Sequence, residues 1–103
     1  MKYVIHTPED LGRALRAARK SARVRLDDLS QTVGLSKQTT TNVEQGKPTV
    51  QIGSVLRLLE EVGLSVSLEV PESAMPALER LQQAARKASE PSPSDRRPSK
   101  PSA

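Results

Sequence analysis

Cysteine is absent from this sequence of 103 residues, and histidine occurs once, as His6. The lack of cysteine excludes disulfides, a thiol nucleophile and a metal site built on thiolates, and a single histidine excludes any site that needs two. The longest apolar runs are far shorter than the roughly 18 residues that span a bilayer, and the N-terminal stretch MKYVIHTPED has no apolar signal core. We therefore expect a cytoplasmic protein that does not insert into a membrane.

Chain length and charge narrow the remaining classes of protein. A chain this short forms one small domain, and folding buries only about two-thirds of its surface, so a partner can add to its stability. The 16 Lys and Arg residues outnumber the 12 Asp and Glu residues, which gives a net charge of +4 and a pI of about 9.9. This balance favours an anionic partner, although a mildly basic pI is also common in proteins that never meet nucleic acid.

Catalysis is not indicated by any pattern of acids or bases in the chain. The acid pairs at 27–28 and 60–61 are sequence neighbours, which point in different directions on a helix, so neither pair is placed as a catalytic dyad. His6 has no partner nearby that could orient it as a base. We expect neither an enzyme nor a bound cofactor or metal.

The first predicted helix begins at Pro8. Thr7 lies at the N-cap position, and two acids, Glu9 and Asp10, occupy the first turn, where they complement the helix dipole. Six basic residues then follow with no acid among them: Arg13, Arg16, Arg19, Lys20, Arg23 and Arg25. Both a solvated face and a face that contacts phosphates fit this pattern.

Two short helices around Gly34 form the central motif. The apolar spacing predicts one helix at Leu26–Val33, ended by Gly34 in the left-handed conformation, and another at Lys37–Gln45, capped by Ser36. Two helices of about eight residues that meet across a short turn containing glycine are typical of a helix-turn-helix.

The apolar pattern changes its period near the end of the domain. A fourth helix is predicted at 52–62, ended by Gly63. Apolar residues then alternate with polar ones, at Leu64, Val66, Leu68 and Val70. This alternation predicts a strand at 64–70. Because one strand cannot satisfy its own backbone hydrogen bonds, we expect it to pair with the same strand of a second copy in a homodimer.

The expected fold is therefore mainly α, with four to five helices. Residues 1–70 form a repressor-like helix-turn-helix domain that ends in the short C-terminal strand. A weak fifth helix is predicted at 74–88, within residues 71–90, because its alanine-rich surface offers little to bury. Residues 91–103 are rich in proline and serine and carry no large apolar side chain, which predicts a disordered tail.

The third predicted helix presents polar side chains on its outward side. Helical spacing places four of them together: Lys37, Gln38, Thr41 and Asn42. A side-chain amide can bond adenine through two hydrogen bonds, a lysine can reach the acceptors of guanine, and hydroxyls can bind phosphate oxygens. Ser36 can cap the helix, bond a phosphate, or do both. This chemistry predicts double-stranded DNA as the partner.

The stretch DDLSQTVGLSKQTTTNVEQGKP resembles the Cro/repressor-type (XRE) helix-turn-helix family. The resemblance implies that Lys37, Gln38 and Asn42 read bases. It implies phosphate contacts from Ser36, Thr39, Thr41 and Lys47. Arg25-Leu26 departs from the family pattern, which often has a phosphate-clamping Thr-Gln at the start of the second helix, and Arg25 is expected to supply the charge there instead. The resemblance also implies a structural ion pair between Arg19 and Glu44. Thr40 departs from the family pattern, because the buried position that it occupies usually holds isoleucine.

The two ends of the domain, TPEDLGRALRAARK and LLEEVGLSVSLEV, resemble those of the HipB-like antitoxins. This resemblance implies a homodimer that binds an inverted repeat in operator DNA, neutralises a HipA-type serine/threonine kinase toxin and autorepresses its operon. A stand-alone repressor of a phage or a restriction system would use the same DNA chemistry without a toxin. A helical interaction module would leave the third helix merely solvated. Both alternatives stand beside the antitoxin hypothesis.

Overall fold

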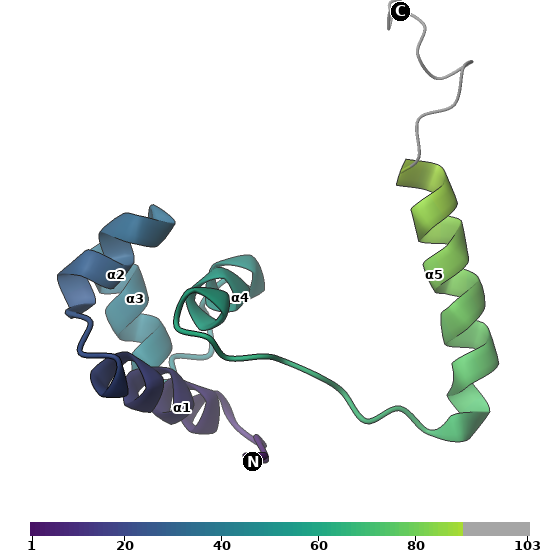
Figure 1. Ribbon diagram of the computed structural model, residues 1–103, viewed down its shortest axis with the longest axis horizontal. Coiled ribbons are helices and arrows are strands. Elements are labelled where there is room, and N and C mark those ends of the chain that lie inside the picture. The colour runs from purple at the N-terminus through teal and green to yellow at the C-terminus, as the bar shows by residue number, and fades with distance from the viewer. Residues whose placement is uncertain (90–103) are drawn as a thin grey trace, which may run out of the picture. The chain divides into compact units, whose positions relative to one another are not determined.

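The computed structural model describes residues 1–89, and Figure 1 shows its helices. The α-helices in this range are α1 (Pro8–Ser21), α2 (Leu26–Val33), α3 (Lys37–Glu44), α4 (Ile52–Glu61) and α5 (Met75–Ser89), and a short 3-10 helix, η1 (Glu72–Ala74), precedes α5. The chain divides into one unit at 1–67 and another from Leu68 onward. The predicted disordered tail at 91–103 lies outside the described residues.

Helix α1 begins at Pro8, as predicted, and its first turn is closed by a capping box. The Thr7 hydroxyl accepts a hydrogen bond from the Asp10 amide at 3.1 Å, and the Asp10 carboxylate accepts one from the Thr7 amide at 3.1 Å. The His6 amide also donates to this carboxylate, and it is the main reason why the pKa of Asp10 is lowered. The cap satisfies amides that no helical carbonyl reaches.

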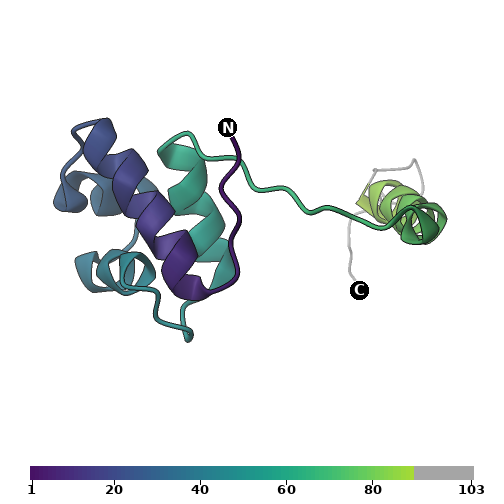
Figure 2. The ribbon, with the colours of Figure 1, turned by 90° about the horizontal axis from the view of Figure 1, so that it is seen from below.

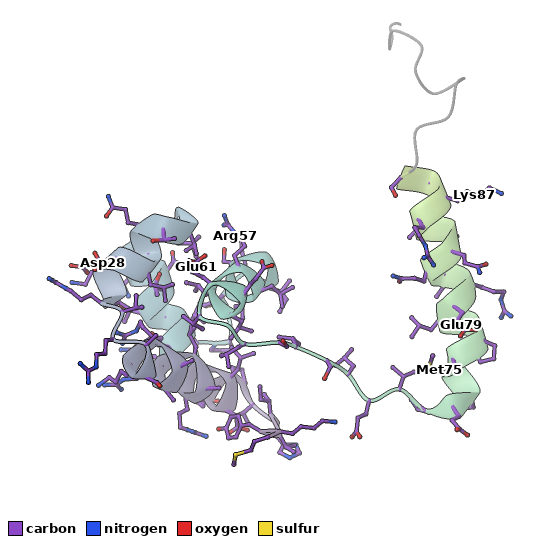
Figure 3. All side chains as sticks on the ribbon, in the orientation of Figure 1. Asp28, Arg57, Glu61, Met75, Glu79 and Lys87 are labelled. Carbon is purple, nitrogen blue, oxygen red and sulfur yellow. The ribbon has the colours of Figure 1, made fainter. Side chains whose placement is uncertain are left out.

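Helices α2 and α3 meet in the predicted arrangement. Gly34 ends α2 with φ at +74°, a left-handed conformation that a residue with a Cβ adopts only at a cost. The Ser36 hydroxyl then accepts from the Thr39 amide at 3.0 Å and caps α3. At the last residue of α2, next to the turn, the Arg57 guanidinium of α4, labelled in Figure 3, donates to the Val33 carbonyl at 3.1 Å. Both ends of the turn are thus tied by side chains.

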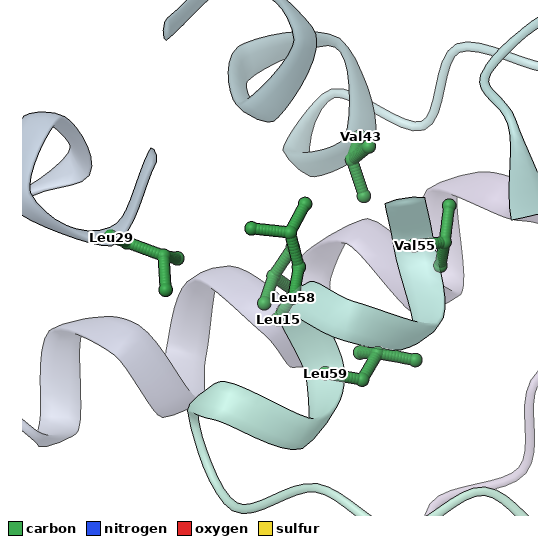
Figure 4. Packing of buried hydrophobic residues seen from close by; sticks show 6 residues of the cluster. All are labelled: Leu15, Leu29, Val43, Val55, Leu58 and Leu59. Atoms are coloured by element: carbon green, nitrogen blue, oxygen red, sulfur yellow. The ribbon is translucent and has the colours of Figure 1, made fainter. Parts of the chain in front are cut away.

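The core lies between the first four helices, and each of them contributes to it. Figure 4 shows its six buried apolar side chains, Leu15, Leu29, Val43, Val55, Leu58 and Leu59. Helix α3 packs against both α1 and α2, and α2 also packs against α4 (Figure 1 and Figure 2). Gly12 permits the close approach of α1 to α3, because a Cβ there would overlap the backbone carbonyl oxygens of Val43 and Glu44.

No strand occurs in residues 1–89, so the strand predicted at 64–70 is absent from the single chain. The segment leaves the core after Leu64 and exposes its apolar side chains, with Val66 at 55% and Leu68 at 84% of full exposure. A strand requires a partner for its backbone hydrogen bonds, and no segment of the described chain pairs with this one. The pairing of two copies through residues 64–70 stays a prediction.

The second unit, taken by itself, is dominated by α5. The helix is one residue offset from the predicted range of 74–88 and has no buried residue. Its apolar side chains, among them Leu78 and Leu81, are exposed, while Glu79 and Lys87 lie on the same helix in Figure 3. None of the helices in the described part of the chain has the length and apolar character needed to cross a membrane.

Candidate nucleic-acid interface

Two buried hydroxyls fix the rotation of α3 against α2. Thr40 is fully buried on the inner side of α3, and its hydroxyl lies 2.7 Å from that of Ser30 on α2. The two hydroxyls also reach backbone carbonyls, Ser30 that of Leu26 at 2.9 Å and Thr40 that of Ser36 at 3.2 Å. Each polar group therefore has a partner, which offsets the cost of burying the threonine hydroxyl.

The ion pair between Arg19 and Glu44 joins α1 to the last residue of α3. The Arg19 Nε and Nη2 atoms donate to the two Glu44 carboxylate oxygens at 2.5 and 3.0 Å, and Nη1 donates to the Val24 carbonyl at 3.0 Å. The side chains are only 12% and 8% exposed. Hydrogen bonding to Glu44 raises the pKa of Arg19 above its ordinary value. Both charges are thus occupied within the fold, and neither is directed at a ligand.

On its outer side, α3 carries two amides that are bonded to each other. The Gln38 Nε2 atom donates to Asn42 Oδ1 at 2.8 Å, one turn further along the helix. With the amides in this orientation, Gln38 keeps its oxygen as an acceptor and Asn42 keeps its amino group as a donor. An acceptor beside a donor matches the N6 amino group and N7 atom that adenine presents in the major groove.

The start of α3 and the start of α2 form a charged cluster. The Lys37 ammonium lies 3.2 Å from Asp27 Oδ1, and Arg25 Nη2 lies 3.9 Å from Asp27 Oδ2. All three residues are exposed. Two of the predicted DNA contacts, Lys37 and Arg25, are therefore brought to the same carboxylate.

The predicted phosphate contacts lie along α3 and beyond its end. Ser36 donates its hydroxyl proton to Thr39 Oγ1 at 2.8 Å, while its oxygen caps the helix. Thr39 and Thr41 are partly exposed, and Lys47 is exposed in the loop after α3, where its amide donates to the Asn42 carbonyl at 3.0 Å. Because a phosphate oxygen only accepts, a contact from Ser36 to a phosphate requires its hydroxyl proton to turn away from Thr39.

Comparison with known proteins assigns the family. A family described as "Helix-turn-helix domain" matches residues 10–69. The chain belongs to this helix-turn-helix family. A relative in Sinorhizobium fredii (strain NBRC 101917 / NGR234), named as the uncharacterized HTH-type transcriptional regulator y4mF, is 39% identical over 67 residues, which are 65% of this chain and 88% of the relative.

Solved structures confirm the predicted HipB-like fold of this helix-turn-helix protein. A structure described as a HipA-HipB-O2-O3 complex matches it with a TM-score of 0.62 at 20% identity, over 69% of this chain and 100% of the other. A HipB-O4 20mer complex matches with the same TM-score, identity and coverage. At this identity the likeness concerns the fold alone.

Two residues of the site were not predicted from the sequence. Asp27 is an exposed acid that contacts Lys37, and Ser30 is a buried serine that bonds Thr40. A signal for Asp27 was present, because the first turns of the two helices of this motif lie close together and an acid in one faces a lysine in the other. Ser30 could have been found by asking which hydroxyl would satisfy Thr40, ten residues further on.

Proposed function

We propose that the chain is a sequence-specific DNA-binding repressor that acts as the antitoxin of a type II toxin–antitoxin system. The observation that carries the DNA-binding part is the outer side of α3. Its amides and lysine are held on a helix whose inner side is locked by Thr40 and by the ion pair at Glu44. A rigid helix that presents such groups suits insertion into the major groove.

In this proposal the predicted contacts fall into two classes. Lys37 bonds guanine, and Gln38 and Asn42 bond adenine, so these three side chains read the sequence. The phosphate contacts set the position of the protein on the duplex and come from Ser36, Thr39, Thr41, Lys47 and Arg25. Removing a base reader should lower specific binding, whereas removing a phosphate contact should lower all binding to a similar degree.

The proposed assembly is a homodimer joined through residues 64–70. Val66 and Leu68 are exposed in the single chain, and pairing with the same segment of a second copy would cover them and satisfy the backbone. Two α3 helices related by a two-fold axis would then lie about 34 Å apart and read an inverted repeat. Val66→Pro should shift the mass measured by light scattering towards the monomer. An unchanged mass would contradict the strand pairing.

The toxin part of the proposal depends on the HipB-like fold and on the resemblance of the two ends of the domain to HipB-like antitoxins. One of the solved neighbours is a complex that includes HipA. By this reasoning the partner here is a HipA-type serine/threonine kinase, which the dimer neutralises while it represses its own operon.

A stand-alone repressor is the second candidate, because the relative from Sinorhizobium fredii is named only as a transcriptional regulator. A tagged pull-down from the native host, with nuclease added to remove DNA-bridged proteins, distinguishes the two. Recovery of a kinase-fold protein in near-equal amount supports the antitoxin. Recovery of the bare homodimer, with specific DNA binding intact in a parallel shift assay, supports the stand-alone repressor.

A further inference from the structure

Asp27 is an acid in a surface patch that the proposed function assigns to DNA. Its two carboxylate oxygens lie 3.2 Å from the Lys37 ammonium and 3.9 Å from the Arg25 guanidinium. A carboxylate repels DNA phosphates, so a protein selected only for affinity would not place one between two of its cations. The position of Asp27 therefore needs a reason other than binding strength.

Stability does not supply that reason. The side chains of Lys37 and Asp27 are 67% and 52% exposed, and ion pairs at such exposure add little to folding. An acid in the first turn of α2 does complement the helix dipole, but Asp28 occupies the same turn and provides the same interaction. Asp28, labelled in Figure 3, is exposed and has no ion pair in the described part of the chain.

The chemistry of the ammonium group connects Asp27 to sequence reading. Lysine carries three donors on one freely rotating nitrogen, and on its own it binds phosphate as readily as it binds a base. When one donor is engaged by Asp27, two remain, which matches the two acceptors, O6 and N7, that guanine presents in the major groove. The nearby negative charge also makes a phosphate a poorer competitor for the same lysine.

We infer that Asp27 is a positioning residue that holds the Lys37 ammonium for guanine and keeps it from DNA phosphates. This inference rests on the proposed function and deepens it. The carboxylate weakens binding to DNA of any sequence, and it restricts the lysine to sites where guanine accepts both remaining hydrogen bonds. Specificity then arises partly from a repulsive element, which lowers the affinity for wrong sites more than for the right one.

Asp27→Asn in the full chain tests this inference, with Asp28→Asn as the matched control. Binding of each variant is measured to a duplex selected by the wild-type protein, to the same duplex with each guanine replaced in turn, and to random duplex, over a series of salt concentrations. For Asp27→Asn we expect tighter binding to random duplex and a salt slope steeper by about 0.9, as for one further phosphate contact. The ratio of specific to random affinity should fall about tenfold, and the penalty for replacing one particular guanine should shrink.

The control variants decide between this inference and a general effect of charge. Asp28→Asn should change specific and random affinity by the same factor and leave the ratio unchanged. In a Lys37→Ala background, Asp27→Asn should no longer alter the guanine penalty. Thermal unfolding of Asp27→Asn should match the wild type, so that any change in specificity is not a change in folding.

Three results overturn the inference without touching the proposed function. The first is an equal effect of Asp27→Asn and Asp28→Asn on the specificity ratio. The second is an unchanged ratio and guanine penalty in Asp27→Asn. The third is a preference for cytosine that disappears with Asp27→Asn even when Lys37 is alanine, which would make the carboxylate itself a base reader. If the wild-type protein selects no sequence at all, the proposed function fails, and this inference fails with it.

Discussion

Separating Arg19 from Glu44 should destabilise the domain more than any exposed substitution, because the pair is almost buried. The proposed variants are Arg19→Met, which keeps the length of the side chain, Glu44→Gln, which keeps its shape, and the double variant. Removing one partner of a buried pair costs about 3–5 kcal/mol when the other charge is left without compensation. With side-chain exposures of 12% and 8%, the pair is nearly but not fully buried, so its loss should lie at or somewhat below this range.

The two single variants should lose different amounts of stability. Arg19→Met leaves the Glu44 carboxylate without its guanidinium and also removes the bond to the Val24 carbonyl, so we expect a loss of about 2–4 kcal/mol. Glu44→Gln leaves an amide oxygen that can still accept from Arg19, so about 1–2 kcal/mol is expected. A unit of residues 1–67 is stable by roughly 3–10 kcal/mol, so Arg19→Met should lose a large share of its free energy of unfolding.

Urea unfolding followed by the helical circular dichroism signal measures these losses, and the double variant completes the cycle. The double variant should lose about 1–3 kcal/mol less stability than the sum of the two single variants. Additivity within about 0.5 kcal/mol would refute the reasoning, because it would mean that the two groups do not act on each other. The folded pKa of Arg19 is raised, so its contribution is present below the unfolded pKa and is lost only as the pH rises through the folded value. The losses should therefore be the same at pH 6 and pH 8.

Three further predictions concern the DNA-facing side and the start of α1. Gln38→Ala and Asn42→Ala should each weaken specific binding by about 1–3 kcal/mol in anisotropy titrations. Because the bonded amides are proposed to read one base pair, the double variant should lose less than the sum of the two. Full additivity would mean that the two amides read different base pairs. Lys47→Ala should flatten the salt slope by about one unit on specific and random duplex alike, and an unchanged slope would remove it from the phosphate contacts. The pKa of Asp10 is lowered in the folded state, so its carboxylate stabilises the fold above the ordinary pKa of 3.8. This stabilisation is lost as the pH falls through the folded pKa. Asp10→Asn should therefore make the stability less dependent on pH below 3.8. An acid limb identical to the wild type would contradict this.

The local elements were predictable from the sequence because their signals are local. Thr7 and Ser36 are caps, Gly34 is a left-handed helix end, and each acts within four residues of its own position. The helix that follows Gly34 and the side of it that faces outward follow from these positions and from helical spacing alone. The turn between α1 and α2 was harder to predict, because Arg23 adopts a positive φ of 60° although it is not glycine.

The helix-turn-helix and the polar side chains on its outward face therefore follow from the sequence, because periodicity and caps need no distant partner. How those side chains are engaged depends on the packing of the helices against one another. Asp27 reaches Lys37 only when the first turns of α2 and α3 come together, and Ser30 satisfies Thr40 only when the two helices pack. Segment 64–70 also depends on contacts that are distant in the sequence. Its alternation predicts a strand, but a strand forms only against a partner, and the single chain contains none among residues 1–89.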